Sequence, residues 1–273
     1  TIAPYIKNKL VDPAVLSVDE GGNFVIPLLS GHIGGANGFA KALAKVIKAT
    51  PVVTTATDVN KLFAVDEWAA RNNMIINSMK AAKDFAAALV DGQEVGLFTD
   101  YPIISALPRQ IVLKDKGVTG LAITKNRNVN PFDLTVQLWP RNIYLGIGCR
   151  RGTTLESIET LVLPKLKELG IDLRTIVGVA SVDLKKDEAG LLNFAAKYNW
   201  EISFFTAEEL QNAAGEFSSS DFVKSVVGVS NVCERSAVLA ANNGSIISSK
   251  CSLNGVTLAV AEADIVLDFE KLS

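Results

Sequence analysis

The sequence predicts an α/β protein, with a layered α/β N-terminal portion and a separate three-layer α/β/α C-terminal domain. Short β-branched runs alternate with longer stretches of helical periodicity, which is typical of α/β layered folds. The 273 residues are 48% hydrophobic and 21% charged. That composition is ordinary for globular domains and excludes intrinsic disorder. At roughly 100–200 residues per domain, the length corresponds to about two compact units or three small ones.

The N-terminal half shows strand and helix patterns in alternation. Strands are expected at residues 23–29, 50–55 and 94–99, and helices at 38–48, 62–71 and 79–90. Between residues 100 and 133, prolines, glycines and a polar run leave room for short strands at most, so loops and a boundary are expected there. The predicted domains are an N-terminal domain at 1–59, expected to be incomplete, a middle region at 60–138 and a C-terminal α/β domain at 139–273.

The C-terminal domain is predicted in the same way. Strands are expected at residues 143–148, 176–182, 201–205 and 255–261, and helices at 154–169, 187–198, 207–213 and 231–241. Thr153 and Glu156 have the spacing of a capping box, which predicts the start of the long helix. Gly170 is a typical residue just after a helix end.

Charge and residue counts limit the classes of function. The net charge of −2 gives no general attraction for nucleic acid or for an anionic membrane. No apolar run approaches the roughly 18 residues of a membrane span. Three cysteines without a C-x-x-C pair argue against a disulfide framework and favour a reducing cytoplasm. One histidine and no paired cysteines leave almost nothing for a zinc site.

A glycine-rich loop follows the strand at residues 23–29. Glycines permit close backbone approach and positive φ, and backbone N–H groups at a helix start receive anions. The candidate binding residues of this loop are Ser30, Gly31, Gly34, Gly35 and Asn37. His32 adds a titratable imidazole at the carboxyl end of a strand, where open α/β sheets bind ligands. The alternative is a tight turn that needs only glycine, and the spacing is not that of a P-loop.

A second loop places two arginines between glycines, just before the long helix. Arginine donates bidentate, charge-assisted hydrogen bonds to carboxylates and phosphates, so the candidate binding residues are Gly148, Arg150, Arg151 and Thr153. The alternative is a solvated charged loop. Cys149 could have a lowered pKa beside Arg150 and a helix end, although a structural cysteine is the favoured interpretation.

Two further carboxylates are candidates. Glu234 begins the helix expected at 231–241, where it either caps that helix, the favoured interpretation, or binds a ligand. Asp58 lies in a polar turn after the second strand and is the better placed of the carboxylates that could transfer a proton.

Several ordered motifs resemble one family. They are residues 24–37 (FVIPLLSGHIGGAN), 50–58 (TPVVTTATD), 145–153 (LGIGCRRGT), 186–191 (KDEAGL) and 227–234 (VGVSNVCE). Together they resemble the cobalt-precorrin-5A hydrolase family of anaerobic cobalamin biosynthesis across almost the whole chain, least between about residues 100 and 138. The family usually has a further strand–helix portion before the position of Ile2, and residues from it could complete the site.

The resemblance implies an acetaldehyde-forming hydrolase that opens the δ-lactone of cobalt-precorrin-5A and gives cobalt-precorrin-5B. Cobalt arrives inside the tetrapyrrole substrate, so no cofactor and no protein metal ligand are expected. We expect a cytoplasmic protein without nucleic-acid or membrane partners. A homodimer and transient contact with neighbouring pathway methyltransferases stay open. The alternative function is a non-catalytic carrier that shields a corrinoid intermediate.

Residue chemistry and motif position suggest a mechanism. His32 would act as general base for water attack on the lactone carbonyl, and N–H groups around Gly34 and Gly35 would stabilise the oxyanion. Asp58 would manage a proton in the later carbon–carbon cleavage. Arg150 and Arg151 would hold peripheral carboxylates of the ring between the two domains.

Overall fold

The computed structural model describes residues 2–7, 12–31, 34–55, 59–60, 62–215, 217 and 231–270. The chain divides into two compact units. Thr1–Pro140 and Leu267–Ser273 form the first unit, and Arg141–Val266 forms the second. Both units combine sheets with helices, which confirms the predicted α/β class. Within the described ranges, every helix is too short or too polar to cross a membrane.

The first unit contains a small sheet that packs against one face of a helix. Its elements are β1 (Val15–Val18), β2 (Phe24–Leu29), β3 (Thr50–Pro51) and α1 (Ala36–Ile47). Strand β2 pairs antiparallel with β1 and parallel with β3, and Val25 packs with Ala40 and Ala44 of α1. The strand predicted at 50–55 is shorter than expected, because regular pairing ends soon after the Val52 N–H donates to the Val25 carbonyl at 2.8 Å.

A second sheet of the first unit has the order β4-β8-β7-β5-β6. Its strands are β4 (Met74–Ile76), β5 (Val95–Thr99), β6 (Ile111–Leu113), β7 (Gly117–Ile123) and β8 (Phe132–Pro140), and its helices are α3 (Val65–Arg71) and α4 (Met79–Val90). The prediction of loops between residues 100 and 133 is wrong for the residues of β7, because this strand lies inside the sheet. Gly96 and Gly120 lie against the Phe132 ring. A Cβ at Gly96 would come within 2.2 Å of the ring, and a Cβ at Gly120 within 2.5 Å. These glycines therefore serve close packing.

Residues after 266 pack on the first unit, although the sequence analysis assigned them to the C-terminal domain. The Leu267 N–H donates to the Pro102 carbonyl at 2.8 Å, and the Trp68 indole N–H donates to the Asp268 carbonyl at 2.9 Å. The Phe269 ring stacks on Trp68 with centroids 4.7 Å apart and planes 7° apart. Leu267 and Phe269 of this tail, residues 267–270, are thus buried in the first unit.

The second unit is built on a sheet with the order β11-β10-β9-β13-β12. Its strands are β9 (Ile143–Cys149), β10 (Ile176–Val182), β11 (Glu201–Phe205), β12 (Ser245–Leu253) and β13 (Val256–Glu262), and its helices are α5 (Leu155–Glu168), α6 (Ala189–Lys197), α7 (Ala207–Gln211) and α9 (Val232–Ala240). Strands β9, β10 and β11 are parallel, and β13 is antiparallel to β9 and β12. Strand β12 was missed by the sequence analysis.

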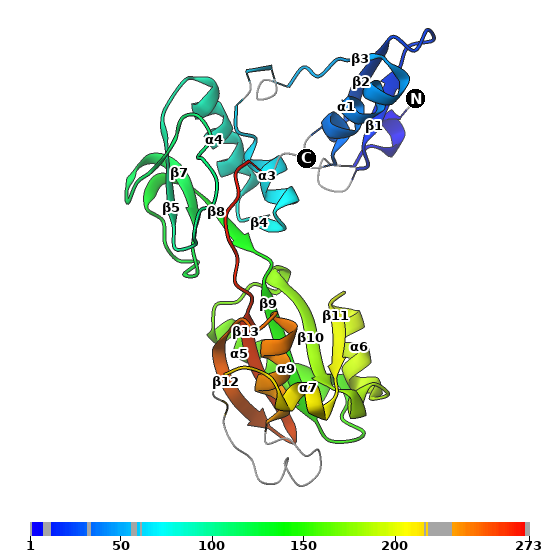
Figure 1. Ribbon diagram of the computed structural model, residues 1–273, viewed down its shortest axis with the longest axis vertical. Helices are drawn as coiled ribbons and strands as arrows, with labels where there is room; N and C mark the ends of the chain where they lie inside the picture. Colours follow the sequence, from blue (N-terminus) through cyan, green and yellow to red (C-terminus); the bar gives the residue numbers. More distant parts are fainter. Residues whose placement is uncertain are drawn as a thin grey trace. The chain divides into compact units, whose positions relative to one another are not determined.

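Helices cover both faces of this sheet, as the three-layer prediction requires (Figure 1). Leu145 and Ile147 of β9 pack in one core with residues of α5 and α6. On the other face, a Cβ at Gly146 would come within 1.8 Å of the Cys233 carbonyl oxygen of α9. Glycine at this position therefore lets the first turn of α9 lie directly on β9.

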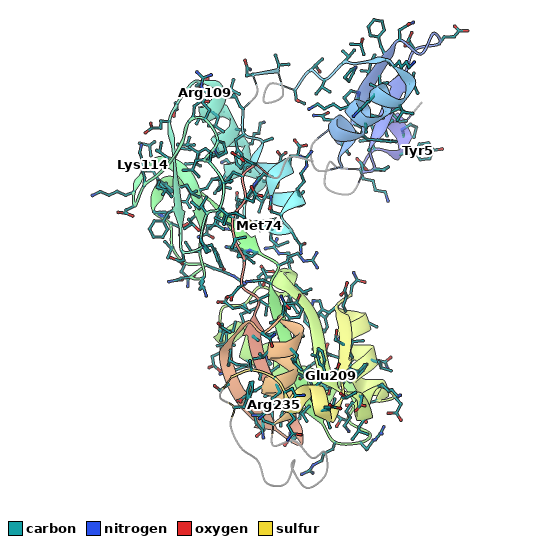
Figure 2. All side chains as sticks on the ribbon, viewed as in Figure 1. Tyr5, Met74, Arg109, Lys114, Glu209 and Arg235 are labelled. Atoms are coloured by element: carbon teal, nitrogen blue, oxygen red, sulfur yellow. The ribbon has the colours of Figure 1, made fainter. Side chains whose placement is uncertain are left out.

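Side chains fix the helix ends in the second unit. The α5 N-cap is Thr154, whose hydroxyl accepts from the Ser157 N–H at 3.2 Å. The capping box predicted for Thr153 and Glu156 is therefore wrong, because the cap lies one residue later and the residue three positions after it is a serine. Helix α7 has a complete capping box from Thr206 and Glu209. Figure 2 labels Glu209 and also Arg235 of α9, whose Nη1 donates to the Leu210 carbonyl at the end of α7 at 2.9 Å.

Candidate functional site

The loop after β2 is a tight turn that leads into α1. Ser30 has a positive φ of 56°, and its hydroxyl donates to the Asp12 carbonyl at 2.7 Å. A Cβ at Gly34 would come within 2.3 Å of the Ser30 Cβ, so the close approach of Ser30 requires glycine at position 34. Gly35 is the α1 N-cap with φ of 77°, and it gives the first turn of the helix no capping side chain. The close approach and the positive φ expected of glycine in this loop are thus confirmed, and binding of a ligand by the loop stays a prediction.

Asn37 links this loop to the segment after β3. Its side chain is only 1% exposed, and its Nδ2 donates to the Thr55 Oγ1 at 3.3 Å. The Asn37 N–H also donates to the Gly31 carbonyl at 2.9 Å. The loops after two parallel strands therefore meet at one sheet edge, the position where such sheets bind ligands. His32 and Asp58 lie outside the described residues, and their catalytic roles stay predictions.

In the second unit, the loop after β9 is fixed to the start of α6. Gly152 has φ of 74°, and its N–H donates to the Glu188 Oε1 at 2.9 Å. The Thr153 hydroxyl donates to the Arg150 carbonyl at 2.8 Å. A Cβ at Gly190 would come within 2.0 Å of the Thr153 carbonyl oxygen, which shows how closely α6 packs against this loop.

Arg151 forms ion pairs with the loop after β10. Its Nη1 lies 2.5 Å from the Asp187 Oδ1, and its Nη2 donates to the Leu184 carbonyl at 2.9 Å. The hydrogen bond from Arg151 lowers the pKa of Asp187. The Glu188 carboxylate is 5% exposed, with Oε2 at 3.6 Å from the Lys185 Nζ and 4.0 Å from Arg151. Cations and carboxylates therefore alternate at the carboxyl ends of β9 and β10.

Arg150 and Gly148 face the hairpin between β12 and β13. The Arg150 N–H donates to the Gly255 carbonyl at 3.2 Å. The stem of Arg150 lies over Gly255, where a Cβ would come within 2.8 Å of the Arg150 Cδ. A Cβ at Gly148 would come within 2.6 Å of the Thr257 Oγ1. Each glycine makes room for a neighbouring side chain.

The Cys149 thiol is not activated. Burial raises its pKa, and this outweighs the opposite effect of Lys185. The lowered pKa considered from the sequence is therefore wrong, and desolvation is the reason. The structural interpretation of this cysteine agrees with its packing against the core of the second unit.

Glu234 lies inside the second unit. It is 3% exposed, and its Oε1 accepts from the Lys250 N–H of β12 at 2.7 Å. The pairing of β12 with β13 is irregular between Ser248 and Cys251, so the carboxylate binds a main-chain N–H next to that irregularity. Its backbone N–H donates to the side chain of the α9 N-cap, Asn231, at 3.0 Å. Its role in substrate binding stays a prediction.

The structure places the candidates in two groups. The first unit holds Ser30, Gly31, Gly34, Gly35 and Asn37, and the second holds Gly148, Arg150, Arg151, Thr153 and Glu234. The sequence analysis chose none of residues 185–188 as a candidate, although Lys185, Asp187 and Glu188 form the ion pairs around Arg151. The signal that could have identified them in the sequence is a pair of basic residues followed by a pair of acidic residues, soon after the next parallel strand. Among the described residues, acidic, cysteine and histidine side chains form no cluster fit for a metal ion.

Three family models match consecutive parts of the chain. Residues 1–58 match "Cobalamin synthesis G N-terminal", residues 63–140 match "Cobalamin biosynthesis central region", and residues 143–261 match "Cobalamin synthesis G C-terminus". The three matches follow one another in the order of the β1–α1, β4–β8 and β9–β13 segments.

Curated relatives match over nearly the whole chain. Cobalt-precorrin-5A hydrolase of Priestia megaterium is 32% identical over 95% of this chain and 74% of its own length. Cobalt-precorrin-5A hydrolase of Salmonella typhimurium is 34% identical over 96% of this chain and 78% of its own length. A solved structure, a putative cobalamin biosynthesis protein G homolog from Sulfolobus solfataricus, is 24% identical over 96% of this chain and 78% of its own, with a TM-score of 0.41.

Proposed function

Because the chain belongs to the cobalt-precorrin-5A hydrolase family of cobalamin biosynthesis, we propose that it opens the δ-lactone of cobalt-precorrin-5A and releases acetaldehyde to give cobalt-precorrin-5B. The observation that carries this proposal is the 32–34% identity to relatives of that name over 95–96% of the chain. Cobalt is bound by the macrocycle of the substrate, so the protein itself supplies no cofactor.

The geometry of the loops supports a substrate with many carboxylates. The ring carries acetate and propionate groups, which require cations and N–H donors. In the first unit, the α1 N-cap Gly35 supplies no capping side chain, although the Ala36 and Asn37 N–H groups already donate to the Ser30 and Gly31 carbonyls at 3.1 and 2.9 Å. In the second unit, the loop with Arg150 and Arg151 lies at the carboxyl ends of parallel strands. The arginine-containing loop of the second unit is the typical anion-binding arrangement of the two.

The proposed mechanism has two stages. His32 takes a proton from water as it attacks the lactone carbonyl, and N–H groups near Gly34 and Gly35 stabilise the oxyanion. Collapse breaks the acyl C–O bond and leaves a ring acetate and an alkoxide, which takes a proton to become an alcohol. Asp58 then removes the alcohol proton, the adjacent C–C bond breaks to release acetaldehyde, and the ring carbon keeps the electron pair and is protonated.

The deciding experiment is anaerobic incubation of the protein with cobalt-precorrin-5A. Acetaldehyde is measured by a coupled dehydrogenase assay, and the macrocycle is measured by mass spectrometry. Equimolar aldehyde and a ring that gains water and loses acetaldehyde would support the proposal. Tight binding of the substrate without aldehyde would contradict it and favour the carrier function instead.

Substitution of His32 tests the first stage. We expect His32→Gln to lower kcat by about 10²–10⁴, the usual contribution of a general base, while the melting temperature stays within a few degrees of wild type. Near-normal acetaldehyde release would remove His32 from the mechanism. Asp58→Asn should instead accumulate the ring-opened alcohol, with a mass increased by one water molecule and no aldehyde released.

A further inference from the structure

We propose that the two adjacent arginines have different roles: Arg150 binds a peripheral carboxylate of the substrate, and Arg151 holds the loop in place. This inference rests on the proposed function and makes it more specific, because the sequence alone assigned both arginines to the ligand. Three observations carry it: the partners of Arg151, the anchoring of Arg150, and the position of the loop in the fold.

Arg151 is already occupied by the protein. One guanidinium nitrogen is paired with Asp187, and another donates to the Leu184 carbonyl. The Glu188 Oε2 lies 4.0 Å away as well. These contacts join the loop after β9 to the segment after β10. A ligand carboxylate at Arg151 would have to displace Asp187, so Arg151 is a positioning residue.

Arg150 is held at its backbone and along its stem. Its N–H donates to the Gly255 carbonyl at 3.2 Å, and its own carbonyl accepts from the Thr153 hydroxyl at 2.8 Å. Its Cγ, Cδ and Nε lie over Gly255, within 3.1 Å of where a Cβ would be. Its guanidinium, by contrast, contacts no hydrogen-bonding or charged partner in the part of the chain that the structure describes.

Such an arginine is suited to bind a carboxylate. The guanidinium is always charged and presents a planar fork that matches a carboxylate in bidentate geometry. Because the backbone and stem are already ordered, less side-chain entropy is lost on binding. The loop follows β9 at the carboxyl edge of parallel strands, where α/β sheets bind ligands. Asp187 and Glu188 are paired with Arg151 and Lys185, so they do not compete for Arg150.

The test compares Arg150→Lys with Arg174→Lys. Arg174 is an exposed arginine of the same unit that pairs with Asp172 just before β10, so the control carries the same chemical change away from the loop. Binding of cobalt-precorrin-5A is followed by its visible absorbance under anaerobic conditions, and turnover by acetaldehyde. We expect Arg150→Lys to raise Kd and KM about tenfold and to keep kcat within twofold. Arg174→Lys should leave both constants unchanged.

A methyl-esterified form of the substrate distinguishes recognition of a carboxylate by Arg150 from a purely structural role of Arg150. A ring whose acetate and propionate groups are methyl esters should bind wild type and Arg150→Lys with equal affinity, because the charged acceptor is gone. A merely structural role for Arg150 would weaken both ligands alike. Arg151→Lys should lower the melting temperature and raise Kd by less than Arg150→Lys does.

A second pair of variants tests the positioning by the hairpin. Gly255→Ala places a methyl group against the Arg150 stem, whereas Gly170→Ala has a similar φ of 66° with open space around the added Cβ. Both should lose similar stability, and only Gly255→Ala should weaken binding. The inference is overturned if Arg150→Lys binds like Arg174→Lys, if Gly255→Ala binds like Gly170→Ala, or if wild type binds no substrate. Binding without aldehyde release overturns the proposed function alone, since Kd still tests Arg150.

Discussion

Replacing Phe269 by alanine should destabilise the first unit selectively. The Phe269 ring is 4% exposed, stacks on Trp68 and lies 5.8 Å from the Phe63 ring. A buried Phe→Ala change typically costs about 3–5 kcal/mol. At about 2–4 °C per kcal/mol for a unit of this size, the lower value corresponds to a fall of about 6–12 °C in Tm.

Differential scanning calorimetry of the whole chain is the suitable assay. Phe194→Ala removes a fully buried ring of the second unit and identifies that unit's transition. Phe39→Ala removes a ring of the first unit that is 56% exposed, so it controls for the chemical change and should shift Tm little. A shift below 2 °C for Phe269→Ala, or a shift confined to the transition that Phe194→Ala moves, would refute the placement of the tail in the first unit.

Two further predictions concern the second unit. Glu188→Ala leaves the Gly152 N–H and the Lys185 ammonium without their carboxylate, and should lower the free energy of unfolding, measured in urea, by about 2–3 kcal/mol. Glu188→Gln keeps a hydrogen-bond acceptor and should lose less stability, so equal losses in the two variants would contradict the role of Glu188 as that acceptor. Burial raises the pKa of the Cys149 thiol, and it raises the pKa of the Cys233 thiol to about 11, so both hold less thiolate at pH 7 than an ordinary cysteine. Peptide mapping should show slow iodoacetamide alkylation, slowest at Cys233, that still increases above pH 9, whereas a rate that is constant from pH 7 to 9 would argue against raised pKa values.

Local signals predicted the regular elements well. Helix α4 spans Met79–Val90 as expected, because its apolar residues recur with helical spacing and Ser78 caps its first turn. Strands β10 and β11 also have the expected bounds, since each is a β-branched or aromatic run between clear breaks. In these segments the sequence neighbours of a residue determine its conformation.

The failures came where distant contacts decide the structure. Gly117 and Gly120 suggested turns, yet both belong to β7, where Gly120 leaves the space that the Phe132 ring occupies. Strand β12 was missed since its alternating serines suit an edge strand that pairs only with β13 in the described sheet. Both errors follow from tertiary packing that overrides local preference.

The same distinction holds for the candidate site. Glycines and arginines identified the loops after β2 and β9 from local sequence. Which arginine is already paired depends on Asp187, which lies 36 residues after Arg151 and is brought to it by the parallel pairing of β9 with β10. Because the register of β9 and β10 is not evident from the sequence, the sequence alone does not show which of the two arginines is paired.

The return of the chain to its first unit affects how the protein forms during synthesis. Trp68 donates its indole hydrogen to a carbonyl 200 residues later, so at about 5–20 residues per second the ribosome needs roughly 10–40 s to deliver that acceptor. Residues 141–266 are contiguous and complete sooner. The nascent first unit therefore waits with an aromatic site uncovered while the whole second unit is made.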